Sequence, residues 1–398
     1  MSNLGTGPMT GVKILDLSQV VAGPLATQML AEQGAEVIKI EPLAGELLRL
    51  GLRGGLPPLF ASDNRGKRCV AIDAQTPEGT ELIVALAHDV DIFIENFRPG
   101  VAERLGVHEA AIRAVNPDII YVSITGFGPS GPYADRACLD PVIQGLTGMV
   151  DGQRSTELPF PDLIRTLVAD KTTAYTAAQA MSAALFARER GAGGQRIELA
   201  MLDAVLAWFW PDGMSDHTAL DDPQPRRRAS DGYRLTDTAD GQIIYYLAST
   251  DQICGMWRAL ERTDMLEDGR YNHIGLGIDP EALAVVGATI VGEIGKLPTV
   301  EILARLARES VPAGPIHDRP GVLNDPQVVH NEILVEWEHP TIGRLRQPRP
   351  APHFDGTPTT MRCHIEDVGE STVEILRSIG RDDAEIERLL AAGIVSAP

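Results

Sequence analysis

Cysteine is scarce in this chain, and its spacing excludes two kinds of site. The 398 residues include four cysteines, which lie far apart and form no CxxC pair. They are Cys69, Cys138, Cys254 and Cys363. This pattern provides neither a disulfide framework nor a zinc site, and it is typical of reduced thiols in a reducing compartment. We therefore expect a cytoplasmic protein that holds no metal.

Basic residues and long apolar runs are also lacking. The chain has 35 Lys and Arg against 55 Asp and Glu, a formal net charge of −20. Nucleic acids and anionic membranes need a basic face, so neither is expected as a partner. An anionic small ligand would need a local cluster of Arg and Lys within this repulsive field. No stretch approaches ~18 uninterrupted apolar residues, and the start MSNLGTGPMT is neither basic nor apolar, so we expect no membrane span or signal peptide.

A dinucleotide-binding fingerprint is missing, although the N-terminal pattern of strand, turn, helix and strand invites one. The fingerprint needs GxGxxG in the first turn, followed by an acid about 20 residues on. Here the turn Ser18–Pro24 (SQVVAGP) holds one glycine, followed by proline. Glu41 stands where a ribose-binding acid would, but a charged residue commonly ends a strand. Walker loops, HExxH and GxSxG are absent too, so a nicotinamide oxidoreductase is disfavoured.

An alternation of strands and helices fills the first 210 residues. Hydrophobic residues make up 44% and charged residues 23%, an ordinary globular composition for two or three domains. Apolar runs predict strands at 12–17, 35–40, 69–73, 90–97, 119–125 and 195–199, and periodicity predicts helices at 24–33, 77–88, 171–190 and 202–210. Strands that alternate with helices indicate a parallel, doubly wound α/β domain with right-handed crossovers.

The remaining sequence changes character twice. Residues 213–231 are polar, contain proline and lack periodicity, so they are interpreted as a linker after the large domain of 10–212. Residues 232–335 hold a strand at 242–248 and a helix at 300–310, which indicates a smaller α+β domain. Residues 336–398 contain a Pro-rich return linker and amphipathic helices at 372–378 and 382–392. These helices are expected to pack back on the large domain.

Eight short segments form an ordered set along the chain. They are Gly11–Pro24 (GVKILDLSQVVAGP), Gly34–Glu41 (GAEVIKIE), Asn64–Arg68 (NRGKR), Glu95–Gly106 (ENFRPGVAERLG), Gly126–Tyr133 (GFGPSGPY), Gly191–Ala204 (GAGGQRIELAMLDA), Val311–Ile316 (VPAGPI) and Asp325–Val328 (DPQV). Together they resemble the class III CoA-transferases, the family of formyl-CoA, carnitine and bile-acid CoA-transferases. Each is weak singly, but the ordered set is specific. The resemblance implies a Rossmann-like large domain built from both chain ends, a smaller domain from the middle, and an interlocked homodimer.

The resemblance places the catalytic nucleophile at Asp170, beside the long Ala-rich helix. Taken alone, an Asp at a helix start is more often an N-cap. In the family, the matching carboxylate attacks an acyl-CoA thioester and then carries CoA as an aspartyl-CoA thioester. The implied activity is transfer of CoA from an acyl-CoA to a carboxylic acid, with acyl-CoA as substrate and no tightly bound cofactor.

The CoA site is also carried over from the family, residue by residue. The implied lining positions are Val20, Val21, Ile72, Asp73, Ala74, Gln75, Asn96, Phe97, Arg98, Arg104 and Arg136. Arg98 and Arg104 are the candidates for phosphate pairing, because a guanidinium fork fits phosphate oxygens. Arg65, Lys67 and Arg68 add to the basic residues of this region.

Two departures from the family pattern affect the phosphate contacts. Pro42 follows Glu41 where the formyl-CoA enzyme has Arg, and Ala137 aligns with a Lys of that enzyme, so the neighbouring Arg136 is the candidate substitute. The contacts with the CoA phosphates must therefore differ in detail.

Two alternatives to a transferase stay open. A racemase branch of the family uses a His in a Gly-His-Asp run, but the corresponding run here is Cys138-Leu139-Asp140, and Leu139 cannot exchange a proton. The other alternative is a CoA-binding protein without turnover, which would leave the carboxylate of Asp170 without an obvious purpose.

Overall fold

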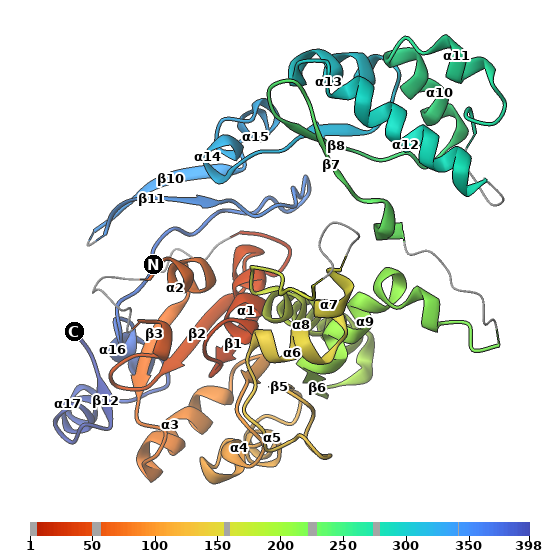
Figure 1. Ribbon diagram of the computed structural model, residues 1–398. Coiled ribbons are helices and arrows are strands. Elements are labelled where there is room, and N and C mark those ends of the chain that lie inside the picture. The colour runs from red at the N-terminus through yellow and green to blue at the C-terminus, as the bar shows by residue number, and fades with distance from the viewer. Residues whose placement is uncertain (1–5, 50–56, 155–159, 222–228, 274–278, 341) are drawn as a thin grey trace. The chain divides into compact units, whose positions relative to one another are not determined.

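Two compact units make up the chain in the computed structural model, which describes residues 6–49, 57–154, 160–221, 229–273, 279–340 and 342–398 (Figure 1). The larger unit comprises Met1–Pro211 and Glu332–Pro398, so it includes both ends of the chain, and the smaller unit is Asp212–Asn331. None of the described helices is long and apolar enough to cross a membrane.

The larger unit is organised around a mostly parallel sheet. Its strand order, within the described residues, is β12-β3-β2-β1-β4-β5-β6. The strands are β1 (Lys13–Asp16), β2 (Glu36–Glu41), β3 (Arg68–Ile72), β4 (Ile92–Glu95), β5 (Ile120–Thr125), β6 (Arg196–Ala200) and β12 (Val395–Ser396). All neighbours among β1–β6 are parallel, and β12 adds an antiparallel edge by pairing Val395 with Ile72. The six predicted strands are confirmed to within two residues at each end.

Helices cover both faces of this sheet. One face packs against α3 (Pro77–Ala87), α5 (Glu109–Val115), α16 (Thr372–Ser378) and α17 (Asp383–Ala391). The other packs against α1 (Ala22–Glu32), α6 (Asp140–Leu146), α8 (Val168–Ala187) and α9 (Met201–Gly213). Central strands are buried on both sides, which explains their continuous apolar character. The two C-terminal helices contribute Ile375, Leu376, Ile386 and Leu389 to the apolar core on the first face.

The sheet has one position where the order of its strands reverses. From β1 the chain continues to β2 and β3 on one side, and then crosses to β4, β5 and β6 on the other. In open α/β sheets, ligands bind outside the carboxyl ends of the strands at such a switch point. The turn after β1 and the segment after β4 meet there, so these two segments frame the candidate site.

The smaller unit is α+β. It has a three-stranded antiparallel sheet, β7 (Leu235–Asp237), β8 (Gln242–Tyr245) and β9 (Ala313–Pro315), and its helices include α10 (Thr250–Ala259), α12 (Pro280–Ile294) and α13 (Thr299–Arg308). A core around Met256 and Trp257 joins them. Of the predicted linker, residues 222–228 lie outside the described residues, and helix α9 runs on to Gly213. A hairpin of β10 (Leu334–His339) and β11 (Gly343–Pro348) belongs to the larger unit.

Candidate active site

Asp170 lies in the first turn of helix α8 but does not cap it. The helix begins at Val168, and its N-cap is Leu167. Asp170 is 8% exposed, and its carboxylate accepts no hydrogen bond from any residue that the structure describes. The N-cap interpretation of this residue is therefore wrong, and the carboxylate stands unpaired at the positive end of a 20-residue helix.

The cap of α8 comes from Asp140, thirty residues earlier. One oxygen of this buried carboxylate, Oδ2, accepts from the backbone N–H groups of Ala169 (2.7 Å) and Asp170 (3.1 Å). Its other oxygen accepts from Nε2 of Gln144 (2.6 Å), and Oε1 of Gln144 accepts from the N–H of Ile164 (2.9 Å). Helix α6 thus anchors both the start of α8 and the segment that leads into it. In the sequence, Asp140 was recognised only as part of an altered racemase motif, and its role as the cap of α8 was not predicted.

Burial and a second acid set the ionisation of Asp170. Burial, together with the nearby charge of Asp140, raises the pKa of this carboxyl to about 6. Cys138 lies close enough to feel both carboxylates, and burial raises the pKa of its thiol to about 11. At neutral pH the site therefore holds an ionised, weakly solvated carboxylate beside a protonated thiol. Such a carboxylate is poised to act as a nucleophile.

The raised pKa predicts that the ionised carboxylate of Asp170 lowers the stability of the folded protein. Between pH 3.8 and about 6 the folded protein binds a proton that the unfolded chain releases, so stability falls as pH rises through this window. Asp170→Asn cannot ionise and should be more stable above pH 6 by roughly 3 kcal/mol at most, at 1.36 kcal/mol for each pH unit. Thermal melting at pH 8 and pH 4.5 measures this. A variant that melts at or below wild type at pH 8 would contradict the prediction.

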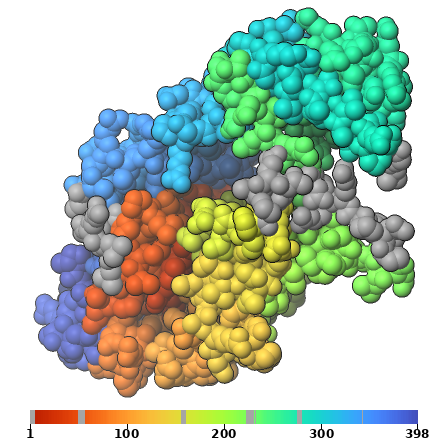
Figure 2. Space-filling model, in the orientation of Figure 1, coloured from red at the N-terminus to blue at the C-terminus, as the bar shows by residue number. Residues whose placement is uncertain are grey.

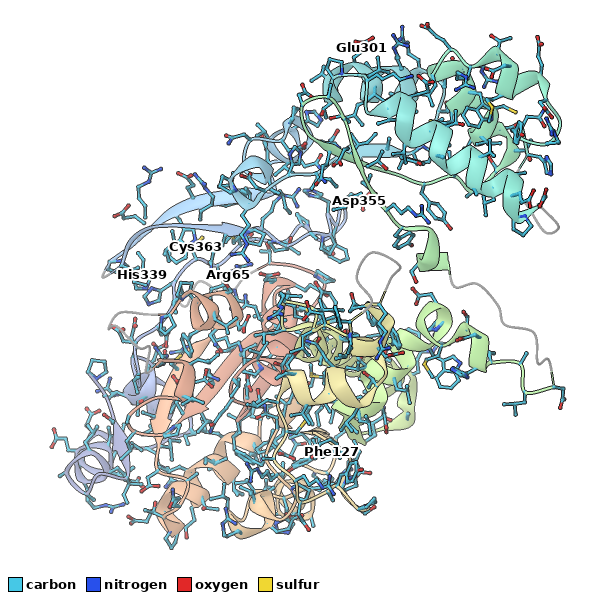
Figure 3. The ribbon with its side chains drawn as sticks, in the orientation of Figure 1. Arg65, Phe127, Glu301, His339, Asp355 and Cys363 are labelled. Carbon is cyan, nitrogen blue, oxygen red and sulfur yellow. The ribbon has the colours of Figure 1, made fainter. Side chains whose placement is uncertain are left out.

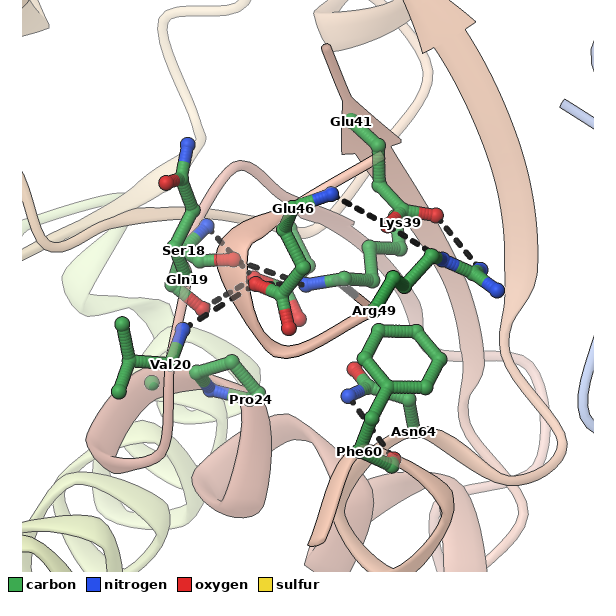
Figure 4. A network of polar contacts seen from close by, with 12 residues as sticks. Ser18, Gln19, Val20, Pro24, Lys39, Glu41, Glu46, Arg49, Phe60 and Asn64 are labelled. Atoms are coloured by element: carbon green, nitrogen blue, oxygen red, sulfur yellow. Dashed lines mark hydrogen bonds and ion pairs between the residues drawn. The ribbon is translucent and has the colours of Figure 1, made fainter. Parts of the chain in front are cut away.

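The turn after β1 is held by three side chains from other segments, of which Figure 4 shows Lys39 and Glu46. Lys39 donates from Nζ to the carbonyl of Ser18 (2.9 Å), and Asn96 both accepts from the N–H of Gln19 (2.8 Å) and donates to its carbonyl (2.7 Å). Glu46 accepts from the N–H of Val20 (3.1 Å). Val20 has φ +68°, a left-handed conformation that costs a β-branched residue about 1–3 kcal/mol. Among the described residues no side chain caps α1, which follows directly. Pro24 has no N–H and Leu25 donates to the carbonyl of Val21, so the N–H groups of this turn without a partner are those of Ala22 and Gly23.

Buried charges lie directly beneath this turn. Lys67 pairs with Asp16 (3.1 Å), which also accepts from the hydroxyl groups of Ser18 and Thr27. Lys39 pairs with Glu46 (3.4 Å). Nearby, Arg49 forms a two-bond pair with Glu41 (2.8 and 2.7 Å). Glu41, the acid that stands where a ribose-binding residue would, is therefore paired with Arg49.

This network extends toward Asp170 through Asp63, near the end of α2 (Pro58–Asn64). Burial raises the pKa of Asp63 to about 7, and the charges of Glu46 and Asp170 act in the same direction. The switch-point turn and the candidate nucleophile therefore belong to one electrostatic neighbourhood.

The basic residues that the sequence grouped together are divided by the structure. Arg65 pairs with Glu32 and donates to the carbonyl of Pro348 in the β10–β11 hairpin (3.0 Å), as its position in Figure 3 illustrates. Arg68 pairs with Glu36 (3.7 Å) and Glu374 (2.7 Å), and Lys67 is buried as described above. All three are engaged in ion pairs within the protein.

Arg98 and Arg104 remain as exposed cations after β4. Within the described residues neither forms an ion pair. Arg98 follows the end of β4, and Arg104 ends the short helix α4 (Val101–Arg104). Arg136 is exposed as well and lies over the ring of Tyr133, 3.8 Å from its centroid. Their exposure at or near the switch-point edge is compatible with phosphate binding.

The other predicted lining residues end neighbouring strands at the same edge. Asn96 clasps Gln19, and Phe97 is half-buried against the core on the α3 side of the sheet. Ile72 and Val21 are about 1% exposed, so their side chains serve the core rather than a ligand. In the turn after β3, Asp73 accepts from the N–H of Gln75 (3.0 Å) and Ala74 is half-buried, leaving Gln75 as the exposed side chain.

Two hollows of about 630 and 590 Å³ lie at the opposite edge of the sheet. Both are lined by Lys13 and His88, and the first also by Glu36 and Arg68, which stand at the amino ends of strands. They are therefore separate from Asp170. Among the residues the structure describes, no group of His, Cys, Asp and Glu could hold a metal ion.

The surface near Asp170 is apolar. Leu139, Val142 and Leu146 on and before α6 are 63%, 43% and 46% exposed. The segment of residues 130–150, coloured yellow in Figure 2, lies at the surface of the larger unit. Helix α6 thus buries Asp140 against the start of α8 and exposes these apolar side chains.

Comparison with known proteins gives concordant matches. A family model described as CoA-transferase family III matches residues 9–371. The human protein named succinyl-CoA:glutarate CoA-transferase is 30% identical over 402 residues, which cover 98% of this chain and 90% of that protein. Formyl-CoA:oxalate CoA-transferase from Streptomyces avermitilis is 29% identical over 425 residues, covering 98% of this chain and all of that protein.

A solved structure agrees in fold as well. The crystal structure of a CAIB/BAIF family protein from Brucella suis superposes with a TM-score of 0.80 at 28% identity, covering 94% of this chain and 100% of that one. The similarity therefore extends over both units rather than over a single nucleotide-binding half.

Proposed function

The chain belongs to CoA-transferase family III and is a transferase, and we propose that it moves CoA from an acyl-CoA thioester to a carboxylic acid by way of an aspartyl-CoA thioester on Asp170. One observation carries the proposal. Asp170 has a buried carboxylate without a hydrogen-bond partner among the described residues, while Asp140 holds its backbone in place. A purely structural aspartate would be expected to bond to the helix that it begins.

The first half of the reaction loads CoA onto the protein. An oxygen of Asp170 attacks the thioester carbonyl, the C–S bond breaks, and CoA leaves as a thiolate from a mixed anhydride. The thiolate then attacks the aspartyl carbonyl carbon, and the donor acid departs as a carboxylate. What remains is an aspartyl-CoA thioester, and no proton has been consumed or released.

The second half reverses these steps with the acceptor. The acceptor carboxylate attacks the aspartyl thioester, the thiolate leaves, and a new mixed anhydride forms. The thiolate attacks the acceptor's carbonyl carbon, which yields the new acyl-CoA and frees the carboxylate of Asp170. One thioester and one carboxylate enter and leave, so the overall exchange is close to thermoneutral.

The oxyanion of each tetrahedral intermediate needs donors from outside α8. In its first turn, the N–H groups of Ala169 and Asp170 are taken by Asp140, and those of Val168 and Lys171 by carbonyls of Thr166 and Leu167. The first turn of α1 packs in the same face layer and has no side-chain cap. We therefore assign oxyanion stabilisation to backbone N–H groups at the start of α1.

The CoA phosphates are assigned to Arg98 and Arg104, with Arg136 in support. Arg98→Ala and Arg104→Ala should each raise the KM for acyl-CoA about tenfold, since a charge-assisted bond is lost, with kcat little changed. The effect should shrink at high salt. Arg190→Ala is the matched control, because Arg190 is an exposed cation next to the amino end of β6. Equal KM values for the control and the two variants would contradict the assignment.

The substrate pair is taken from the relatives, whose names give succinyl-CoA or formyl-CoA as donor and glutarate or oxalate as acceptor. We propose short dicarboxylates as the acceptor class and a homodimer as the active form. A panel of acyl-CoAs with labelled dicarboxylates tests the function, with expected transfer of CoA and parallel lines in initial-rate plots. Binding of CoA without exchange would leave a CoA-binding protein, and α-proton exchange in deuterated water would indicate a racemase.

A further inference from the structure

The turn Ser18–Val20 at the switch point is held largely by side chains that are distant in the sequence. Lys39 reaches the carbonyl of Ser18, and Glu46 holds the N–H of Val20 (Figure 4). Asn96 brackets the peptide groups of Gln19. Residues that bind a ligand through backbone groups must be presented in one conformation. Here that conformation includes a valine in the left-handed region, which local preference does not supply.

Glu46 is unusual because a buried carboxylate serves here to hold one backbone N–H group of the turn. It is 1% exposed, burial raises the pKa of its carboxyl, and its Oε1 has no hydrogen-bond partner among the described residues. Its Oε2 contacts the N–H of Val20 and Nζ of Lys39, whose side chain is also fully buried. A buried ion pair is weak support for stability, because desolvation offsets the attraction of the charges. The pair is better explained by what it fixes in place.

We propose that Glu46, together with Lys39, is a positioning residue that fixes the left-handed turn at Val20 and so sets the affinity for acyl-CoA. The chain reaches a tight switch-point turn without glycine at this position, and the carboxylate takes over the role that glycine has in other nucleotide-binding turns. The proposal rests on the proposed CoA site at this turn, but it does not depend on Asp170 as the nucleophile.

Glycine provides the decisive test, because it adopts positive φ without strain and needs no clamp. CoA binding is measured by titration calorimetry. Glu46→Ala should weaken binding about tenfold, whereas the double variant Val20→Gly/Glu46→Ala should return to within about threefold of wild type. Val20→Gly alone is the reference for the double variant, and adding Glu46→Ala to it should weaken binding by no more than about threefold. Glu46→Gln should stay close to wild type, since its amide oxygen still accepts from the N–H of Val20.

Glu366 supplies the matched control. Burial also raises the pKa of its carboxyl, which accepts from a backbone N–H, that of Cys69 in β3 (2.6 Å), away from the turn. Glu366→Ala should lower the melting temperature without changing the affinity for CoA. If Glu46→Ala does not fold, Lys39→Met/Glu46→Leu removes both charges and should show the same loss and the same restoration by Val20→Gly.

Two outcomes would overturn the proposal: unchanged CoA affinity in Glu46→Ala, or a loss that Val20→Gly does not restore. If wild-type protein fails to bind CoA at all, the proposed function itself fails. If wild-type protein binds CoA and the Glu46 variants bind it with the same affinity, only the positioning role is wrong.

Discussion

Asp170→Ala is expected to lower kcat for CoA transfer by at least about a thousandfold, because no other group can carry the covalent intermediate. CoA affinity should change by no more than a few-fold, since the carboxylate contacts the reacting carbonyl rather than the nucleotide. Single-turnover kinetics and calorimetry separate the two effects. Asp162→Ala is the matched control, because Asp162 is an exposed acid eight residues earlier that pairs with Arg165. Equal losses in both variants would contradict a catalytic role for Asp170.

The pH dependence of the reaction should report the same group. Burial raises the pKa of Asp170 to about 6, and only the ionised form attacks, so kcat/KM should fall about tenfold for each pH unit below 6. Above this pH the profile should be flat until other groups titrate. An acidic limb of the kcat/KM profile near pH 4 would mean that the carboxylate of Asp170 is solvated and paired in the working enzyme.

Asp140→Ala is the second large effect. The change leaves the buried N–H groups of Ala169 and Asp170 without an acceptor, which should cost about 2–4 kcal/mol of unfolding free energy. It also frees the first turn of α8, and a shift of 1 Å in a reacting group can cost about a hundredfold in rate. We therefore expect kcat to fall about a hundredfold with a small change in KM. Denaturant unfolding and steady-state kinetics measure both.

Asp140→Asn separates position from charge. The amide oxygen still accepts from the two N–H groups, so the fold and most of the rate should be retained. The negative charge that raises the pKa of Asp170 is removed, and the acidic limb of the rate profile should move to lower pH. A limb that stays in place would show that burial alone sets this pKa.

The sequence predicted the sheet well for a physical reason. Strands such as β1 and β4 are buried on both sides, so their apolar runs are continuous and easily distinguished from the amphipathic helices between them. The alternation of strands and helices also predicted a mostly parallel sheet, which the structure has. The identity of Asp170 as a candidate came from family resemblance, since its local pattern suggested an N-cap.

The polar machinery around the site was not predictable from local pattern. A capping box is recognised over four residues, whereas Asp140 caps a helix that begins 28 positions later. The Lys39–Glu46 pair is close in sequence, but nothing in GAEVIKIEPLAGE shows that its target is the N–H of Val20. For the same reason the local sequence did not show that Lys67 and Arg65 form ion pairs within the protein. Their partners, Asp16 and Glu32, come from other elements of the fold.

The turn after β1 shows what the scarcity of glycine in this segment does and does not predict. A single glycine excluded a dinucleotide fingerprint, and that exclusion agrees with the family match. The backbone nevertheless adopts a left-handed residue there, because tertiary hydrogen bonds from Glu46 and Asn96 stabilise what the valine itself disfavours. Glycine content predicts which turns form easily, but not which turns are enforced.

Trapping the covalent intermediate tests the central claim most directly. Wild-type protein is incubated with succinyl-CoA without acceptor, treated with hydroxylamine, which converts an aspartyl thioester to a hydroxamate, and digested for peptide mass spectrometry. The account predicts a hydroxamate on Asp170 that is absent without acyl-CoA, is lost on prior addition of acceptor, and never forms in Asp170→Ala. Modification of another carboxylate, or CoA transfer by wild type with Asp170 unmodified, would contradict it.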